Sequence, residues 1–248
     1  MAEITLFSGW HFMYIILIVG GSLLAAFLLK GKTEKTKQTV LGVFACLVTI
    51  VYVADFFLMP LVRTDHAIDI DKLPFHFCTV LAIFVPFAQF NKKFEKVKDV
   101  IACFAIVSSL MYITYPGSAL GGVGVFEYKV VQTFLYHGVL FAWGFLSLTT
   151  GSATLSFKKI WKELVGLVIL VAWGLLGSYT YSNITPHHYD WFFVTGSTYP
   201  FIPAWAMPFV VIAAVFAMCA IIHLIDFVVK KIVAKNAAKK QAKEETKA

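Results

Sequence analysis

The chain has 248 residues, of which 59% are hydrophobic and only 14% are charged, and its mean hydropathy is +0.79. Soluble domains carry about a quarter charged residues, so this composition excludes an ordinary soluble globular protein and indicates an integral membrane protein. The net charge of +7 does not predict nucleic-acid binding, because the lysines fall in short segments between apolar runs and in the C-terminal tail.

Seven apolar runs follow one another along the chain. The first, from about Trp10 to Leu29, has neither a basic segment before it nor a small-residue cleavage site after it, so we expect a retained helix and not a signal peptide. Backbone groups in lipid must be paired within their own segment, so each run is predicted to be a membrane-spanning helix. The other six runs cover about residues 39–62, 74–90, 100–115, 130–150, 164–182 and 203–228.

Four prolines refine these boundaries. Pro74 and Pro203 stand where the third and seventh helices are expected to begin, because proline is tolerated in the first turn of a helix. Pro86 and Pro208 fall inside apolar runs and are expected to bend them.

The basic residues indicate an orientation. The segments after the first, third and fifth runs, together with the tail, hold 18 of the 21 lysine and arginine residues; the other side holds Arg63, Lys72 and Lys129. Cytoplasmic segments are enriched in basic residues. We therefore predict an all-α membrane protein, a seven-transmembrane-helix bundle with its N-terminus outside and its C-terminus cytoplasmic. Residues 1–229 form the membrane domain and residues 230–248 a Lys-rich tail, either a frayed helix or disordered.

A thiol and an imidazole are expected at matching depth on different helices. Cys78 lies four residues past Pro74 and His137 seven residues past Val130, which places both roughly 6–11 Å below the outer surface at about 1.5 Å per residue. A histidine beside a cysteine can accept the thiol proton and activate the sulfur as a nucleophile. The alternative is that Cys78 is only a small buried apolar side chain.

Other polar residues are expected near the outer side. His11 opens the first helix, Asp55 precedes the outer end of the second, and Asn183 lies in the last outer loop. His76 is two residues from Cys78 and should point away from it. His223 and Asp226 are expected at the inner interface.

The signals for disulfides and metals are weak. Cys46, Cys103 and Cys219 are expected near the inner side, so Cys78 has no predicted disulfide partner, and the depths of the cysteines argue against pairing. No H-x-x-x-H or H-x-x-E pattern accompanies the outer residues that a metal site would use. We expect no metal and no cofactor. The outer residues that such a metal site would use are His11, His76, His137, His187 and Asp55.

Three segments carry a resemblance to a known family. The run Leu73-Pro74-Phe75-His76-Phe77-Cys78 resembles the LPLHLC signature of the YwaF-like bacterial membrane proteins. The runs Phe134-Leu135-Tyr136-His137-Gly138 and Phe7-Ser8-Gly9-Trp10-His11 are similar to that family's FxxHG and FSxxH segments. The family is distantly similar to the transmembrane protein 164 ether-lipid acyltransferase.

The resemblance implies a thioester mechanism. A cysteine of the third helix would accept an acyl chain from a phospholipid and a histidine of the fifth would act as base, and these roles fall on Cys78 and His137. The family's last outer loop has an Asn-Tyr pair after an earlier asparagine. Asn183 matches the earlier one, but His188-Tyr189 replaces the pair, so the substrate contacts of this loop differ.

The leading hypothesis is a phospholipid acyltransferase or acyl hydrolase at the outer-leaflet side of a bacterial plasma membrane. Its partners are the phospholipid substrate and membrane lipids. His11 or Asp55 would orient His137, and Asn183 or backbone donors would hold the oxyanion. Two alternatives stay open: a non-catalytic small-molecule transporter or binding protein, and a metal-dependent intramembrane lipid hydrolase.

Overall fold

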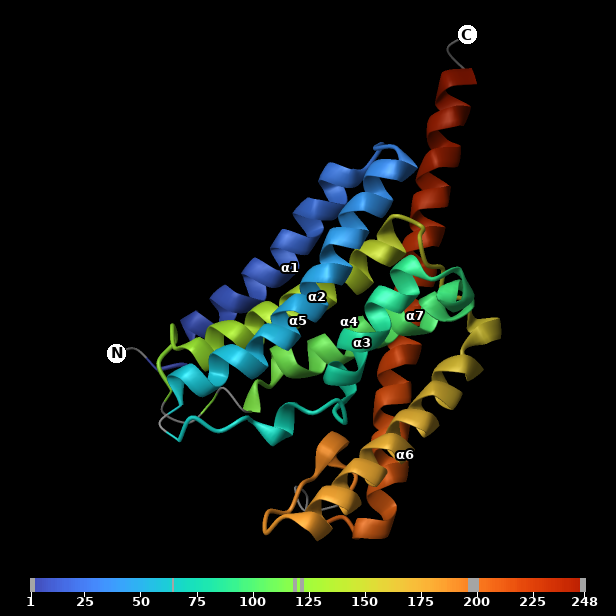
Figure 1. The fold of residues 1–248 in the computed structure, drawn as a ribbon. Coiled ribbons are helices and arrows are strands. Elements are labelled where there is room, and N and C mark those ends of the chain that lie inside the picture. The colour runs from blue at the N-terminus through green and yellow to red at the C-terminus, as the bar shows by residue number, and fades with distance from the viewer. Residues whose placement is uncertain (1–2, 64, 118–119, 121–122, 196–200, 246–248) are drawn as a thin grey trace.

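The computed structural model describes residues 3–63, 65–117, 120, 123–195 and 201–245. Within these ranges the secondary structure is helical, apart from one isolated β-bridge between Glu3 and Gly124, which confirms the all-α prediction. The seven α-helices (Figure 1) are α1 Gly9–Leu29, α2 Glu34–Val62, α3 Phe77–Phe90, α4 Lys98–Thr114, α5 Tyr128–Thr149, α6 Trp161–Ile184 and α7 Met207–Glu245. Short 3₁₀ helices lie between them, and those within the described ranges are η1 Ile70–Lys72, η2 Lys92–Val97, η4 Phe157–Lys159, η5 Trp191–Phe193 and η6 Ala204–Ala206.

The lengths of the helices indicate a multi-pass membrane protein. In the described parts of the chain, six helical segments are long and apolar enough to cross a membrane. The exception is α3, whose 14 residues measure about 21 Å against a hydrocarbon core of about 30 Å. The number of spans and their orientation therefore stay predictions.

The start of α3 differs from the prediction. We expected a helix from Pro74, but α3 begins at Phe77, because side chains from other elements bind the carbonyls of the preceding segment. The Trp173 indole donates to the carbonyl of Pro74 at 2.6 Å, and the Tyr52 hydroxyl donates to that of Lys72 at 2.7 Å. Non-helical backbone at membrane depth is tolerated where protein groups pair it in this way.

The start of α7 differs as well. Pro203 does not open this helix but precedes the short helix η6, and α7 begins at Met207. Pro208 is therefore the second residue of α7 and not an interior one, a place where the missing N–H of proline is not needed. At the other end α7 is helical to Glu245, where the sequence predicted a frayed helix or disorder. The division at residues 229 and 230 falls inside this helix and stays a prediction.

The centre of the molecule is the pair α4 and α5, most of whose residues are buried. Gly144 allows their close approach, since a Cβ there would lie 2.8 Å from the carbonyl oxygen of Ala102. In Figure 1, α1 and α2 lie on one side of this pair and α6 and α7 on the other. Helix α1 is apolar on its outward face, where Leu17 and Phe27 are exposed, as expected for a surface in lipid.

The two ends of the helix bundle differ in how many lysines they carry. We call the end at which α2, α4 and α6 begin the lysine-rich end, and the end at which α3 and α5 begin the lysine-poor end. At the lysine-rich end one hydrogen-bond network joins four helix termini: Gln89 to Gln38 at 3.0 Å, Gln38 to Ser152 at 3.2 Å, and Lys98 to both Gln89 at 3.0 Å and Ser152 at 2.7 Å. Three of the segments rich in lysine therefore meet at one end of the bundle.

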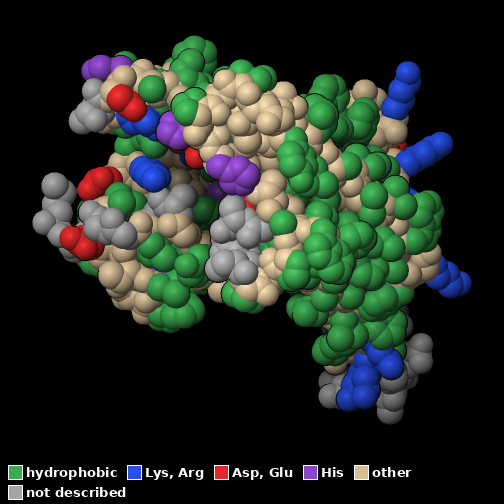
Figure 2. Space-filling view, turned by 90° about the horizontal axis from the view of Figure 1, so that it is seen from below, with side chains coloured by type: hydrophobic (Ala, Val, Ile, Leu, Met, Phe, Trp, Pro, Cys, Tyr) green, Lys and Arg blue, Asp and Glu red, His purple; other side chains and the backbone are tan. Residues whose placement is uncertain are grey.

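The lysine-poor end has its own contacts. The backbone N–H of Ile4 donates to the carbonyl of Val123, joining the N-terminal segment to the α4–α5 connection. After α2, the Arg63 guanidinium donates two hydrogen bonds to Asp65, at 2.8 and 2.6 Å, and holds the pKa of that carboxyl well below its usual value. Figure 2 shows, from below, histidine and acidic side chains gathered with some basic ones on one side of the face, further basic side chains at the opposite edge, and hydrophobic side chains over much of the surface between.

Candidate functional site

Cys78 lies in the first turn of α3 and contacts α5 through its backbone. The side chain of Cys78 is half-buried, and its carbonyl accepts a hydrogen bond of 2.5 Å from the hydroxyl of Tyr136. The next residue on α5 is His137, whose ring centroid lies 5.1 Å from that of Tyr136. The structure thus brings the backbone of Cys78 into contact with Tyr136, the residue that precedes His137.

His137 is buried and held in one orientation. Its side chain is 4% exposed, its ring stacks on Tyr112 at 4.0 Å between centroids, and Nδ1 lies 2.8 Å from the carbonyl oxygen of Thr133. A carbonyl oxygen only accepts, so Nδ1 carries the ring proton and Nε2 carries the lone pair in the neutral imidazole. Within the described residues, Nε2 has no hydrogen-bond partner.

Asp55 does not orient His137. It is 1% exposed and accepts a hydrogen bond of 2.9 Å from the Tyr128 hydroxyl, while its other oxygen lies 3.0 Å from the Lys72 ammonium. Buried carboxylates are stable only when paired in this way. In the sequence Lys72 stood out only as a basic residue on the outer side, because its ion pair depends on how the segment before α3 folds back onto α2.

His11 does not orient His137 either. It is fully buried, and both of its ring nitrogens bond to backbone: Nδ1 accepts from the N–H of Phe7 at 3.0 Å, and Nε2 lies 2.7 Å from the carbonyl of Ile113. It therefore ties the start of α1 to the end of α4. The group that fixes the imidazole of His137 is the Thr133 carbonyl, one helical turn earlier on the same helix.

His76 is the N-cap residue of α3, and its Nδ1 accepts a hydrogen bond of 3.3 Å from the N–H of Phe192 in η5. Phe192 and the following Phe193 both have positive φ, of 65° and 56°, which is rare for bulky residues. Such strain persists only where surrounding contacts impose it, and it is frequent at functional sites. The ring of Phe77 packs on that of Phe192 at 5.2 Å.

Asn183 lies apart from these groups. It is exposed in the last turn of α6, and the hydrogen bonds of the described residues do not join it to Cys78 or His137. In the loop that follows, Tyr189 is buried and stacks on Trp191 at 4.8 Å. The loop is thus attached through its aromatic residues, and Asn183, the oxyanion donor expected from the sequence, is not part of that contact.

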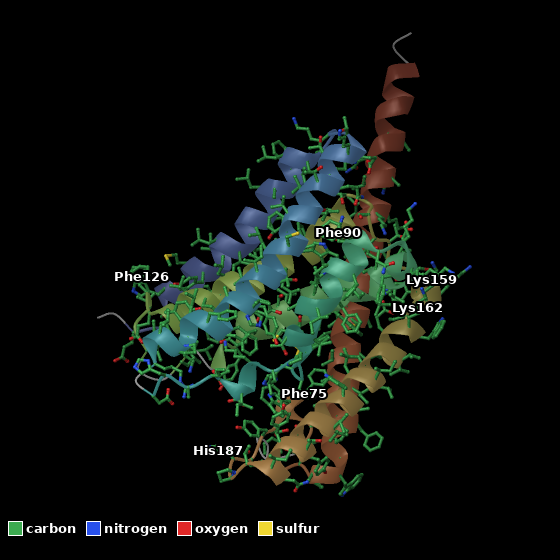
Figure 3. The ribbon with its side chains drawn as sticks, in the orientation of Figure 1. Phe75, Phe90, Phe126, Lys159, Lys162 and His187 are labelled. Atoms are coloured by element: carbon green, nitrogen blue, oxygen red, sulfur yellow. The ribbon has the colours of Figure 1, made fainter. Side chains whose placement is uncertain are left out.

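Aromatic residues of α6 and η5 hold the segment before α3, and the sequence analysis did not single them out. Phe75 packs between Trp173 and Trp191, at 5.1 and 4.9 Å between ring centroids, and Figure 3 shows it beside α6. Gly174 and Gly177 leave space on α6 for this segment, because a Cβ on Gly177 would overlap the Phe75 ring. The signal was present as two small residues three apart on an apolar helix, which mark close packing in membranes.

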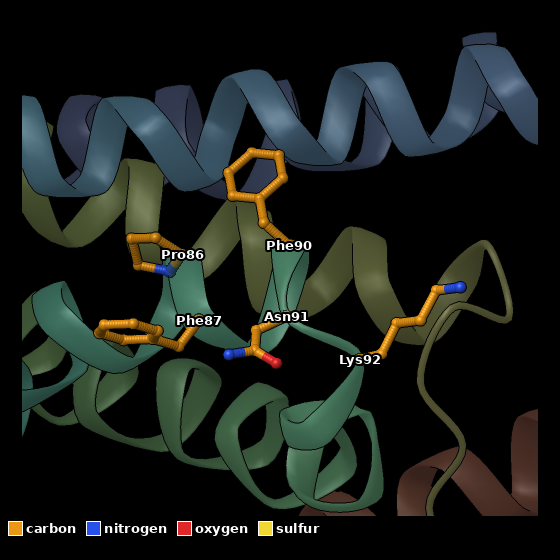
Figure 4. A pocket seen from close by; sticks show the side chains of 5 residues that line it. All are labelled: Pro86, Phe87, Phe90, Asn91 and Lys92. Atoms are coloured by element: carbon orange, nitrogen blue, oxygen red, sulfur yellow. The ribbon is translucent and has the colours of Figure 1, made fainter.

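A pocket of about 450 Å³ lies at the opposite, lysine-rich end of α3 (Figure 4). It is lined by Pro86, Phe87, Phe90, Asn91 and Lys92 and includes none of the candidate residues. Its lining includes no cysteine, histidine or carboxylate side chain, and its one ionisable side chain is Lys92.

A second polar cluster lies at the lysine-rich end. Cys103, Glu163 and His223 are buried, with potential ligand atoms all within 4.8 Å of one another; in the described chain this is the one group with metal-binding spacing. His223, which was expected at the inner interface, is thus buried between helices at the lysine-rich end. Cys103 and Cys219, both expected near the inner side, are neighbours at this end, and all four cysteines are free. The missed signal is the C-x-x-x-H spacing of Cys219 and His223.

A family model described as the TMEM164 family matches residues 6–226 of the chain. The match begins just before α1 and ends within α7, so it includes every candidate residue at both ends of the bundle. No curated protein and no solved structure matches the chain.

Proposed function

The chain belongs to the TMEM164 family, and from this premise we propose that it is a membrane-embedded lipid acyltransferase in which Cys78 is the nucleophile and His137 the general base. Ionisable residues buried within membrane helices are costly and usually functional. Family membership supplies the membrane setting. The roles of the two residues are our assignment, as are the kinship with YwaF-like proteins and a bacterial plasma membrane.

One observation carries this proposal. Nε2 of His137 has no hydrogen-bond partner among the described residues, and His137 directly follows Tyr136, whose hydroxyl contacts Cys78. The Nδ1 hydrogen bond to Thr133 leaves Nε2 as the proton acceptor, and the Tyr136 hydroxyl fixes α5 against the backbone of Cys78. A general base needs an available lone pair and a fixed orientation. His137 has both.

In the proposed reaction His137 takes the thiol proton of Cys78, and the thiolate attacks an acyl ester carbonyl of a phospholipid. The ester C–O bond breaks as the thioester forms, and the lysolipid oxygen leaves with the proton from His137. A second alcohol, or water for hydrolysis, then attacks the thioester and His137 acts again. The first N–H groups of α3 have no helical partner and are the donors we assign to the oxyanion.

The proposed placement puts the lysine-rich end in the cytoplasm and the Cys78 region toward the outer leaflet. The contacts of Gln38, Gln89 and Ser152 support it, because they gather segments rich in lysine at one end. We infer that α3 and the paired segment before it together make the seventh crossing, which leaves the N-terminus outside and the C-terminus inside.

The test is mass spectrometry of the purified protein in phospholipid nanodiscs. We expect a mass increase of one acyl chain, mapped to the peptide that contains Cys78 and removed by hydroxylamine. The Cys78→Ala protein should carry no adduct and transfer no acyl chains, whereas Cys46→Ala, which changes an exposed cysteine of α2, should keep both. Unchanged lipid turnover in folded Cys78→Ala protein would end the proposal and favour a non-catalytic carrier.

A further inference from the structure

Three helices each contribute one potential metal ligand at the lysine-rich end. Cys103 comes from α4, Glu163 from α6 and His223 from α7, and each side chain is at most 2% exposed. Their ligand atoms lie within 4.8 Å of one another. The proposed acyl-transfer site is built at the end where α3 begins, so this cluster is a separate feature.

The direct contact between these residues leaves polar atoms without partners. Nε2 of His223 and Oε1 of Glu163 are 2.9 Å apart, which uses one polar atom of each side chain. In the described part of the chain, Nδ1 of His223 and Oε2 of Glu163 have no hydrogen-bond partner although both are buried. Buried polar atoms are nearly always paired, so an ion pair alone does not account for this cluster.

The donor set fits a divalent transition-metal ion of the zinc type. Sulfur, imidazole nitrogen and carboxylate oxygen are the three ligand types of protein zinc, whereas magnesium and calcium prefer oxygen alone. One thiolate and one carboxylate would balance the two positive charges, so the loaded site would be neutral in a buried environment. The 2.9 Å between the bonded nitrogen and oxygen is close to the roughly 3.3 Å between ligands about 2.0–2.1 Å from a tetrahedral zinc.

Cys219 stands beside the same cluster. It is fully buried and neighbours Cys103. Cys219 and His223 are four residues apart on α7, so they share one face of the helix. Cys219 is not one of the three residues whose ligand atoms lie within 4.8 Å of one another, so it neighbours the cluster without belonging to the ligand set.

A pocket leads to the cluster from the surface. It has a volume of about 270 Å³, and its lining includes His223, Asp226 and Phe157. The Phe157 ring lies 5.6 Å from the ring of His223 and covers it. The pocket reaches His223, and its lining also holds Lys158 and Lys230, the second of which donates a hydrogen bond of 2.7 Å to Asp226.

We propose that Cys103, Glu163 and His223 bind one zinc-type divalent cation. On binding, Cys103 gives up its S–H proton to solvent and forms a sulfur–metal bond. The ion joins α6 and α7 to α4, so it fixes the outer pair of helices to the centre of the bundle.

Cobalt titration of the full-length protein in detergent tests this site. After chelator treatment, Co²⁺ should bind at one ion per chain and give the near-ultraviolet sulfur-to-cobalt band together with the visible bands of a tetrahedral site. Zinc should then displace it, and zinc-loaded protein should unfold at a higher temperature than the stripped protein. A wild-type protein without the sulfur-to-cobalt band overturns the proposal, whatever the variants do.

Matched variants identify the ligands. Cys103→Ser and His223→Gln should each weaken cobalt binding at least about tenfold and remove the rise in unfolding temperature with zinc. Cys46→Ser and Cys78→Ala change cysteines outside the cluster and should bind cobalt like the wild type. A sulfur-to-cobalt band that persists in Cys103→Ser, or is lost in Cys78→Ala, places the metal elsewhere and overturns the assignment.

Discussion

At the scale of single residues, the buried histidines differ in how many of their ring nitrogens have a hydrogen-bond partner. His11 has both nitrogens bonded to backbone, so it links two helices. His137 and His223 each keep one buried nitrogen without a partner among the described residues. An imidazole with both nitrogens bonded has no free lone pair for a proton or a metal. The distinction fits a structural role for His11 and supports the roles proposed for His137 and His223.

His137→Gln tests the proposed base. Glutamine keeps a polar side chain of similar size but accepts no proton at neutral pH, so the rate of Cys78 acylation should fall by about 10²–10⁴-fold. A time course of the acyl adduct by mass spectrometry measures this rate. His66→Gln, which changes an exposed histidine between α2 and α3, is the control and should react like the wild type. Equal rates in the two variants would remove His137 from the mechanism.

At the scale of elements, close helix contacts depend on positions without side chains. Gly144 faces the α4 backbone at Ala102, whereas Gly20 on α1 has nothing within 4 Å of an added Cβ. In lipid, packing at small residues replaces the hydrophobic effect as the force that joins helices. The same reasoning applies to Gly177, which admits the ring of Phe75 against α6.

Gly144→Ala should therefore destabilise the fold while Gly20→Ala should not. The methyl group at residue 144 must push α4 and α5 apart, at a cost of about 1–3 kcal/mol in the free energy of unfolding. At residue 20 it meets only lipid and favours the helix slightly. Denaturation of both variants in mixed micelles measures the difference, and an equal effect would show that α4 and α5 do not approach as closely as described.

At the scale of the whole molecule, the two ends carry different polar groups. The lysine-poor end holds Asp55, Lys72 and the proposed acyl-transfer pair, while the lysine-rich end holds the Lys98 network and the proposed metal site. Basic residues are retained on the cytoplasmic side during insertion, so the charge difference supports the proposed orientation. The two proposed sites would then face opposite sides of the membrane.

Labelling with a membrane-impermeant thiol reagent tests this orientation. In a protein whose native cysteines are replaced by alanine, Asp65→Cys should be labelled on intact cells, because residue 65 follows α2 at the proposed outer side. Lys159→Cys, between α5 and α6, should be labelled only after the cells are opened. Both substituted residues are exposed, so accessibility within the fold does not confound the comparison. The reverse pattern would invert the proposed topology.

The sequence by itself determined that the protein is made of apolar helices in a membrane and roughly where each of them lies. Hydropathy acts locally, so the ranges of α1, α2 and α4 to α6 follow from it within a few residues. It also identified Cys78 and His137 as unusual residues. Their proposed pairing stays a prediction, supported by the contact of Tyr136 with Cys78.

Only the tertiary structure decided which side chains meet. In lipid the outward face of a helix is as apolar as its inward face, so the pattern along the chain does not tell which way a helix is turned. The bonds of His11, the pairing of Asp55 with Lys72, the late start of α3 and the cluster around Glu163 all depend on that rotation. Residues from distant parts of the chain meet there because packing at small side chains and interhelical hydrogen bonds fix how the helices are turned.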